Sequence, residues 1–463
     1  MNEIIIYLAI FITGFIIIEL IVRNIVKSIN KDFQWLIIEK DEAPKLSKQS
    51  LRKFLLHGYD PELGWVRKPN TSHDEIGEKE TTTWHIDESG SRKNPYLGSK
   101  ESKISCYGDS FTFARQVNDD ETWEYYLSEL TKTNVQNFGV GNYGLDQAVL
   151  RLKREFPKNP TKIVIMGVVP DTISRILSMW KHYYEYGNTF GFKPKFKIYD
   201  GNLELLKNPI NTEKKFDEYE KFLSYIQEND FFYKTKFSKE KIAFPYCINI
   251  FRNWKRNSEL IRAVKRIEKN ESDGDNSKEI LWKPMSIIME INLKWRVQLF
   301  QNKNNLDLII KILEEYVIFS KQNNFLPVFV FLPQTDDLLF IKKNYHFYEN
   351  MINAILKIKD LVFFDITKEL IQIKNLDELY SDDNDYGGHY SADGNKKISE
   401  LIANELRERS KKNKILSSHQ MYLLRKIDQF LDGEVELFIP NFVIPPDGSP
   451  IGSNINNWYN CGY

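Results

Sequence analysis

Cysteine is scarce in this chain of 463 residues, which contains only Cys106, Cys247 and Cys461. Three widely spaced thiols form neither a disulfide framework nor a cysteine-rich zinc site. The histidines show no metal-ligand spacing either, so we expect no metal and no other cofactor. The low cysteine count does not exclude a location outside the cytoplasm.

An excess of charge of either sign is also missing, because 64 Lys and Arg residues offset 64 Asp and Glu residues. Nucleic-acid-binding proteins generally carry a basic excess, so we expect no nucleic-acid partner. The hydrophobic fraction of 42% and the aromatic fraction of 14% exclude global disorder. The length allows two domains or one enlarged α/β domain with insertions.

Charge is nearly absent from residues 4–22, IIIYLAIFITGFIIIELIV, where Glu19 is the one exception. At about 1.5 Å per residue this run approaches the ~30 Å thickness of a bilayer core. No basic residue precedes the run and no small-residue cleavage site follows it. The sequence therefore favours a retained membrane anchor over a cleaved signal peptide. A buried soluble helix is the alternative, although the run is apolar on every face.

The orientation of this anchor is left open by the sequence. Arg23, Lys27 and Lys31 follow the apolar run, and basic residues tend to stay on the cytoplasmic side. That tendency favours a cytoplasmic C-terminal part. The segment before the run is too short to decide the question.

Short apolar runs alternate with helical patterns through much of the chain. Strands separated by helices predict a parallel sheet covered on both faces. The predicted strands are residues 104–107, 135–138, 163–169, 328–332 and 362–364. The predicted helices are residues 120–130, 146–156, 306–323 and 398–406.

The aromatic and basic stretch from residue 172 to 300 does not follow this alternation. We interpret it as a mostly helical insertion. The predicted organisation is therefore an anchor at 1–27, a stalk at 28–58, an α/β domain formed by 59–171 and 301–411, the insertion at 172–300, and a C-terminal extension at 412–463. In the insertion, four aromatic residues form either a stacking platform for sugar rings or an aromatic core: Trp180, Tyr183, Tyr184 and Tyr186.

The stretch CYGDSFTFARQV places Ser110 directly after a predicted strand. In a parallel sheet this is the carboxyl edge, where ligands bind. The serine is therefore either part of a turn or an exposed nucleophile. His389 follows the last predicted strand and precedes the last helix, at the same edge. Acyl transfer by serine needs such a base and a group that orients it.

Several motifs together resemble the SGNH (GDSL-type) hydrolases. They are Gly108-Asp109-Ser110, the stretch NFGVGNYGLDQAVLRL, and a late histidine before a Ser-x-x-Gly-Asn helix start. The stretch DPELGWVRKPN and the anchor resemble the membrane-tethered bacterial members. The resemblance covers residues 59–171 and 325–405. It implies a flavodoxin-like three-layer fold and ester hydrolysis through an acyl-serine.

The resemblance also implies roles for individual residues. Ser110 is the expected nucleophile and His389 the expected base. The oxyanion hole is expected to use the backbone N–H of Ser110 and one from Gly141 or Asn142. Asp385 is the expected orienting carboxylate.

The chain departs from the family pattern in three places. Asn142 stands where the family has a second-block glycine. The third block ends in Asp171 and lacks the usual asparagine. Tyr386 stands where the family has its aspartate, and Asp385 lies one residue further from His389. A Ser-His dyad supported by a backbone carbonyl is the alternative to a triad.

The sequence therefore predicts a membrane-anchored serine esterase without cofactors. Its expected substrate is an ester or an acylated carbohydrate, from which it removes or transfers a small O-acyl group, possibly on an envelope glycan. The alternative is a non-catalytic, membrane-tethered carbohydrate-binding module on the same fold.

Overall fold

A computed structural model describes residues 2–32, 43–76, 81–99, 101–185, 187–273, 283–381 and 388–412. At its centre lies a parallel sheet with the strand order β11-β10-β7-β5-β6. Counted along the chain, this is the 2-1-3-4-5 order of flavodoxin-like folds. The predicted α/β class is confirmed. The five strands are β5 (Ser102–Gly108), β6 (Asn134–Asn137), β7 (Ile163–Val168), β10 (Leu326–Phe331) and β11 (Val362–Asp365).

The central strands are buried along their whole length. Every residue of β7, IVIMGV, and of β10, LPVFVF, is buried. Such continuous apolar runs are typical of parallel strands with helices on both faces. The register pairs Ile165 of β7 with Cys106 of β5 and Val328 of β10.

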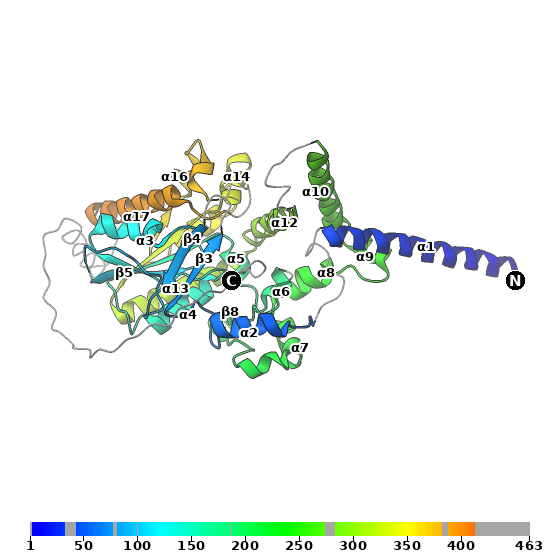
Figure 1. The fold of residues 1–463 in the computed structure, drawn as a ribbon, viewed down its shortest axis with the longest axis horizontal. Helices are drawn as coiled ribbons and strands as arrows, with labels where there is room; N and C mark the ends of the chain where they lie inside the picture. Colours follow the sequence, from blue (N-terminus) through cyan, green and yellow to red (C-terminus); the bar gives the residue numbers. More distant parts are fainter. Residues whose placement is uncertain are drawn as a thin grey trace.

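Helices cover both faces of this sheet, which makes three layers (Figure 1). One face packs against α3 (Trp123–Thr131) and α17 (Ala392–Lys412). The other packs against α4 (Leu145–Glu155), α13 (Lys303–Asn323) and α15 (Glu349–Ile355). Two shorter helices, α14 (Thr335–Lys343) and α16 (Thr367–Ile371), lie in the connections around β11.

The segment before the sheet folds onto the rest of the domain. Helix α2 (Lys48–His57) buries Phe54, whose ring stacks on that of Phe190 at 5.6 Å. The hairpin of β3 (Thr71–Ile76) and β4 (Thr81–Ile86) follows the short pair β1 (Tyr59–Asp60) and β2 (Gly64–Trp65). This hairpin touches the loop after β5, because Thr83 N–H donates to Asn118 and Glu75 pairs with Arg115.

The insertion leaves the sheet after β7 and returns to it before β10. Its elements are α5 (Thr172–Arg175), α6 (Lys181–Tyr184), the hairpin of β8 (Lys195–Tyr199) and β9 (Asn202–Leu206), α7 (Leu223–Asn229), α8 (Ser238–Glu240), α9 (Tyr246–Arg252), α10 (Trp254–Ser272) and α12 (Lys283–Leu299). It is mostly helical, as predicted.

The aromatic residues of the insertion form a core. Trp180, Tyr183 and Tyr184 are buried; Trp180 stacks on Phe192 with ring centroids 4.7 Å apart. The core interpretation is therefore confirmed for these three residues, and the sugar-stacking interpretation is wrong for them. Tyr186 lies outside the described residues.

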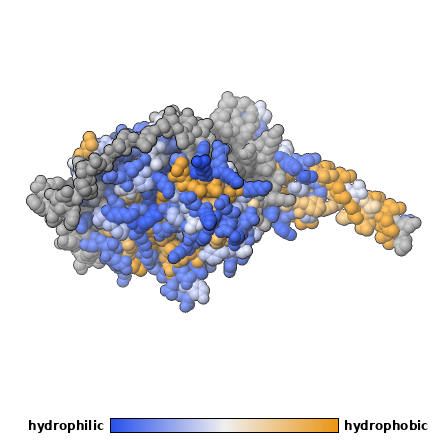
Figure 2. Space-filling view, turned by 60° about the horizontal axis from the view of Figure 1, so that its bottom comes forward, coloured by the Kyte–Doolittle hydropathy of each residue, from blue (hydrophilic) through white to orange (hydrophobic). Residues whose placement is uncertain are grey.

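The N-terminal helix α1 (Asn2–Asp32) contains a stretch, Glu3–Ile29, that is long and apolar enough to cross a membrane. Its apolar side chains are exposed along most of its length (Figure 2). Near its end, Val26 packs with Leu260 of α10 and Ile287 of α12. The carboxylate of Glu19 accepts the N–H groups of Tyr246 and Cys247 in the first turn of α9. The lone charge of the apolar run therefore joins α1 to the insertion.

Candidate active site

Ser110 lies at the topological switch point of the sheet. Strand β5 ends at Gly108, and its neighbours β6 and β7 are reached by connections that run in opposite directions. Ligands of such folds bind at the carboxyl edge at this point. Gly108 allows the close approach of β7, because a Cβ there would lie 1.8 Å from the Gly167 carbonyl oxygen.

The structure brings Ser110 and His389 together. The Nε2 atom of His389 lies 2.9 Å from the Oγ atom of Ser110. Ser110 is 8% exposed, so its hydroxyl sits in a largely enclosed position. His389 comes from the segment just before α17, at the same sheet edge, as its place in the sequence predicted. The geometry is that of a nucleophile and its general base.

The other ring nitrogen of His389 faces an amide. Gln116 Oε1 lies 2.8 Å from His389 Nδ1, and it also accepts hydrogen bonds from Ser381 Oγ at 2.9 Å and from the His389 N–H at 3.3 Å. An oxygen acceptor at Nδ1 fixes the tautomer that carries its proton there. The Nε2 lone pair is then free to accept the proton of Ser110.

Sequence reasoning missed Gln116. An amide in the same loop as the serine has no diagnostic spacing, and the loop reaches His389 only through its turn, in which Ala114 and Gln116 have positive φ angles. Asp385, the carboxylate expected to orient His389, lies outside the described residues.

The surroundings favour a neutral imidazole. Burial lowers the pKa of His389 well below its usual range, and the positive charges of Arg115, Arg175 and Arg67 lower this pKa further. Gln116 is neutral and does not offset them. His389 is therefore unprotonated near pH 7, which is the state that a general base requires.

Two backbone N–H groups of the predicted oxyanion hole are unpaired in the described residues. Within the described ranges, the N–H groups of Ser110 and Gly141 have no hydrogen-bond acceptor. The turn that contains Gly141 is fixed, because its carbonyl accepts Trp65 Nε1 at 2.9 Å and Val140 N–H donates to the Gly108 carbonyl at 3.0 Å. Asn142 follows with a φ of 63°, the left-handed conformation that asparagine tolerates.

Asp109 shapes the loop that presents the serine. It is fully buried; its Oδ1 accepts Phe111 N–H and its Oδ2 accepts Val169 N–H, both at 2.9 Å. Its Oδ2 also lies 3.1 Å from Arg175 Nη1. Burial raises the pKa of Asp109 against the opposing effect of Arg175. The residue joins the loops after β5 and β7, as expected of a loop-shaping hydrogen bonder.

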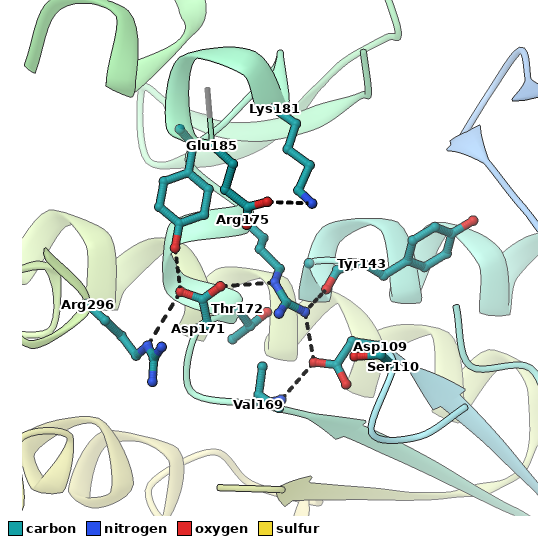
Figure 3. Close-up of polar contacts among 12 residues, drawn as sticks. Asp109, Ser110, Tyr143, Val169, Asp171, Thr172, Arg175, Lys181, Glu185 and Arg296 are labelled. Atoms are coloured by element: carbon teal, nitrogen blue, oxygen red, sulfur yellow. Dashed lines mark hydrogen bonds and ion pairs between the residues drawn. The ribbon is translucent and has the colours of Figure 1, made fainter. Parts of the chain in front are cut away.

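A buried charge network continues from Asp109 into the insertion (Figure 3). Arg175 Nε lies 3.2 Å from Asp171, which also accepts the Tyr184 hydroxyl at 2.7 Å and lies 3.4 Å from Arg296 Nε. Burial would raise the pKa of Asp171, but the charges of Arg296 and Arg175 bring it below the ordinary value. Arg175 is therefore a buried ion that joins the loop of Asp109 to the insertion.

Arg296 links this network to a second strand. It lies on α12 and is 1% exposed. Its Nη2 lies 3.2 Å from Asp336 Oδ2, and its Nη1 pairs with Asp337. Both aspartates lie in the first turn of α14, just after β10. The guanidinium of Arg296 therefore joins the insertion to the carboxyl ends of β7 and β10.

In the part of the chain that the structure describes, no group of three His, Cys, Asp or Glu side chains could hold a metal ion.

No protein-family model and no curated protein matches the chain. Among solved structures, a candidate lipolytic protein of the G-D-S-L family from Desulfitobacterium hafniense DCB-2 is similar at 13% identity, over 66% of this chain and 99% of that chain, with a TM-score of 0.29. A TM-score of this size reflects only a distant likeness.

Proposed function

We propose that this protein is a serine hydrolase that cleaves ester bonds. The observation that carries the proposal is the chain of contacts from Gln116 Oε1 through His389 to the hydroxyl of Ser110, at 2.8 and 2.9 Å. It lies at the sheet edge where flavodoxin-like folds bind ligands. Nucleophile, base and orienting group are the parts that acyl transfer by serine requires.

The reaction would proceed through an acyl-serine. His389 Nε2 takes the proton of Ser110 as Oγ attacks the ester carbonyl carbon. The carbonyl oxygen becomes an oxyanion that the N–H groups of Ser110 and Gly141 would bind, and each such donor typically contributes about 3 kcal/mol. His389 then gives its proton to the departing alcohol. Water, or a hydroxyl of a second substrate, next attacks the acyl group and releases Ser110.

We propose two candidates for the residue that orients His389. The direct contact of Gln116 Oε1 with His389 Nδ1 supports Gln116 as the orienting residue. Asp385 rests on the family resemblance alone, as does the part of Asn142 in the oxyanion hole. A neutral amide fixes the ring tautomer, but it stabilises an imidazolium less than a carboxylate does.

Membrane attachment through α1 is part of the proposal. It is supported by the length and apolarity of Glu3–Ile29, although a signal sequence has the same composition. The side of the membrane is left open. A small O-acyl group on a carbohydrate remains a prediction from the resemblance, because the buried Trp180 and Tyr183 offer no stacking surface.

The alternative is a non-catalytic, membrane-tethered carbohydrate-binding module. One observation favours it: the atom that faces His389 Nδ1 belongs to an amide and not to a carboxylate. The close contact of His389 with Ser110 favours catalysis.

The deciding experiment measures hydrolysis of p-nitrophenyl acetate by the full chain in detergent. We expect turnover by the natural protein, and a fall of at least about a thousandfold for Ser110→Ala and for His389→Ala. Thr112→Ser, in the same loop, is the control for folding of the loop. Equal rates in all four proteins would contradict ester hydrolysis and favour the binding module.

A further inference from the structure

Positive charge is concentrated beside the site, although the chain as a whole is neutral. The charges of three neighbouring arginines act on the guanidinium of Arg67: those of Arg92, Arg115 and Arg151. Arg92 pairs with Asp119 at 3.0 Å, and Arg115 pairs with Glu75. Arg67 and Arg151 have no ion pair among the described residues. Four cations with two carboxylate partners leave a local excess of positive charge.

Arg67 lies between the two loops that form the site. Two residues before it, Trp65 donates through Nε1 to the Gly141 carbonyl and accepts the Tyr143 hydroxyl through its own carbonyl. The guanidinium carbon of Arg67 lies 4.1 Å from the ring centre of Phe113, which belongs to the loop of Ser110. Arg67 therefore packs against the loop that carries Ser110, and its charge acts on His389.

The guanidinium of Arg67 is fixed by stacking and not by hydrogen bonds. Its carbon lies 4.1 Å from the ring centre of Trp84 as well as from that of Phe113. Its Nε is buried without a partner, and the described residues provide no acceptor for its other N–H groups. Burial, with help from the neighbouring arginines, lowers the pKa of Arg67 to about 9, so the group is still charged at pH 7.

A rigid cation with unused donors matches a particular chemistry. Ring stacking occupies the faces of a guanidinium and leaves the N–H groups at its edge pointing outward. Such an edge binds a carboxylate or a phosphate through two parallel hydrogen bonds. The Nε of Arg67 is buried without an acceptor, and an incoming anion would supply one.

We propose that Arg67 binds a carboxylate or phosphate group of the substrate, so that the enzyme prefers esters that carry a negative charge near the scissile bond. This inference rests on the proposed ester hydrolysis. It makes Arg67 a determinant of substrate class, and it describes the substrate as anionic, whichever polymer, lipid or small molecule bears the ester.

The test compares two esters with the same leaving group. Mono-p-nitrophenyl succinate carries a carboxylate close to the ester, and p-nitrophenyl butyrate is neutral. We expect Arg67→Gln to reduce kcat/KM for the succinate ester by about 10- to 100-fold, and for the butyrate ester by less than about threefold. Arg67→Lys should retain part of the preference. Lys68→Gln removes the same charge from the neighbouring residue and should leave the ratio of the two esters unchanged.

Three results would overturn the inference. An equal loss on both esters would mean that Arg67 supports packing against Trp84 and Phe113. No loss on either ester would mean that no substrate group reaches it. A fall of the succinate-to-butyrate ratio in Lys68→Gln as large as in Arg67→Gln would point to a diffuse field and not to a binding site.

A binding measurement separates failure of this inference from failure of the proposed function. If the natural protein hydrolyses neither ester, the full-length Ser110→Ala protein is titrated with sodium succinate and with inorganic phosphate at constant ionic strength, and its melting temperature is followed. We expect one of the two anions to raise it, and Arg67→Gln to abolish the rise. No rise with either anion would overturn the anion site, whereas a rise that depends on Arg67 would retain it without ester hydrolysis.

Discussion

Two arginine-rich regions flank Ser110, and they differ in how their charges are matched. On the insertion side, Arg175 and Arg296 are buried among four aspartates. On the hairpin side, Arg67 is half-buried between two rings, and no acid lies within hydrogen-bond reach of it in the described residues. The matched region holds elements together, and the unmatched region has donors left for a ligand. The net charge of the whole chain is zero, so composition alone does not reveal this difference between the two regions.

The largest expected effect comes from breaking the matched region. Arg296→Met would leave Asp171, Asp336 and Asp337 buried without a shared cation, and such a loss typically costs about 3–5 kcal/mol. We expect that decrease in the free energy of unfolding, measured by urea denaturation of the full chain in detergent. Asp336→Asn and Asp337→Asn combined with Arg296→Met should restore part of it.

A matched control comes from an exposed pair on the insertion. Arg266 is 45% exposed and lies 3.2 Å from Glu290. Arg266→Met should cost less than about 1 kcal/mol, because exposed ion pairs contribute little. A similar small loss for Arg296→Met would show that the network does not hold the insertion.

The pH profile tests the electrostatics of the dyad. The folded pKa of His389 is below 6.5, so the neutral base persists as the pH falls through 6.5 and is lost only below that value. The acidic limb of kcat/KM for p-nitrophenyl butyrate should therefore lie below pH 6.5. Gln116→Glu places a carboxylate at Nδ1, favours the imidazolium, and should move that limb upward by about one pH unit.

Gln116→Met is the matched control, since it removes the acceptor without adding charge. It should lower kcat and leave the limb below pH 6.5. An acidic limb at or above 6.5 in the natural protein would contradict the neutral, buried imidazole. No shift in Gln116→Glu would mean that another group faces Nδ1.

The smallest expected effect concerns stability in the unmatched region. Arg67→Met removes a cation that has no counter-ion, so it also removes the cost of burying that charge. The same substitution removes the contacts of the guanidinium with the Trp84 and Phe113 rings, which contribute roughly 0.5–2 kcal/mol each. We expect a net change below about 1 kcal/mol in the same urea assay. A loss as large as that of Arg296→Met would erase the difference between the two regions.

Much of the fold could be predicted because its signals are local. Strands β7 and β10 are continuous apolar runs because both of their faces are buried, and such runs stand out in a sequence. Ser110 was placed by the same pattern, since it comes directly after β5, and His389 was placed by its position between β11 and α17.

The partners of these residues could not be predicted, because they depend on how loops and inserted helices pack. Gln116 reaches His389 only through a tight turn, and Arg67 reaches the site only because Trp65 is bound to the Gly141 turn. Arg175 has the sequence surroundings of a surface residue. Its burial depends on Arg296, which lies far along the chain and arrives on an inserted helix.

Helix α12 contacts two very different parts of the molecule. Near its start, Ile287 packs in the cluster that contains Val26 of α1, and near its end Arg296 binds the carboxyl edge of the sheet. At about 1.5 Å per residue, its 17 residues extend roughly 25 Å. The helix therefore sets the distance between the end of α1 and the carboxyl edge of the sheet, where Ser110 lies. If α1 lies in a membrane, this length of helix would set how far the carboxyl edge of the sheet stands from the membrane surface.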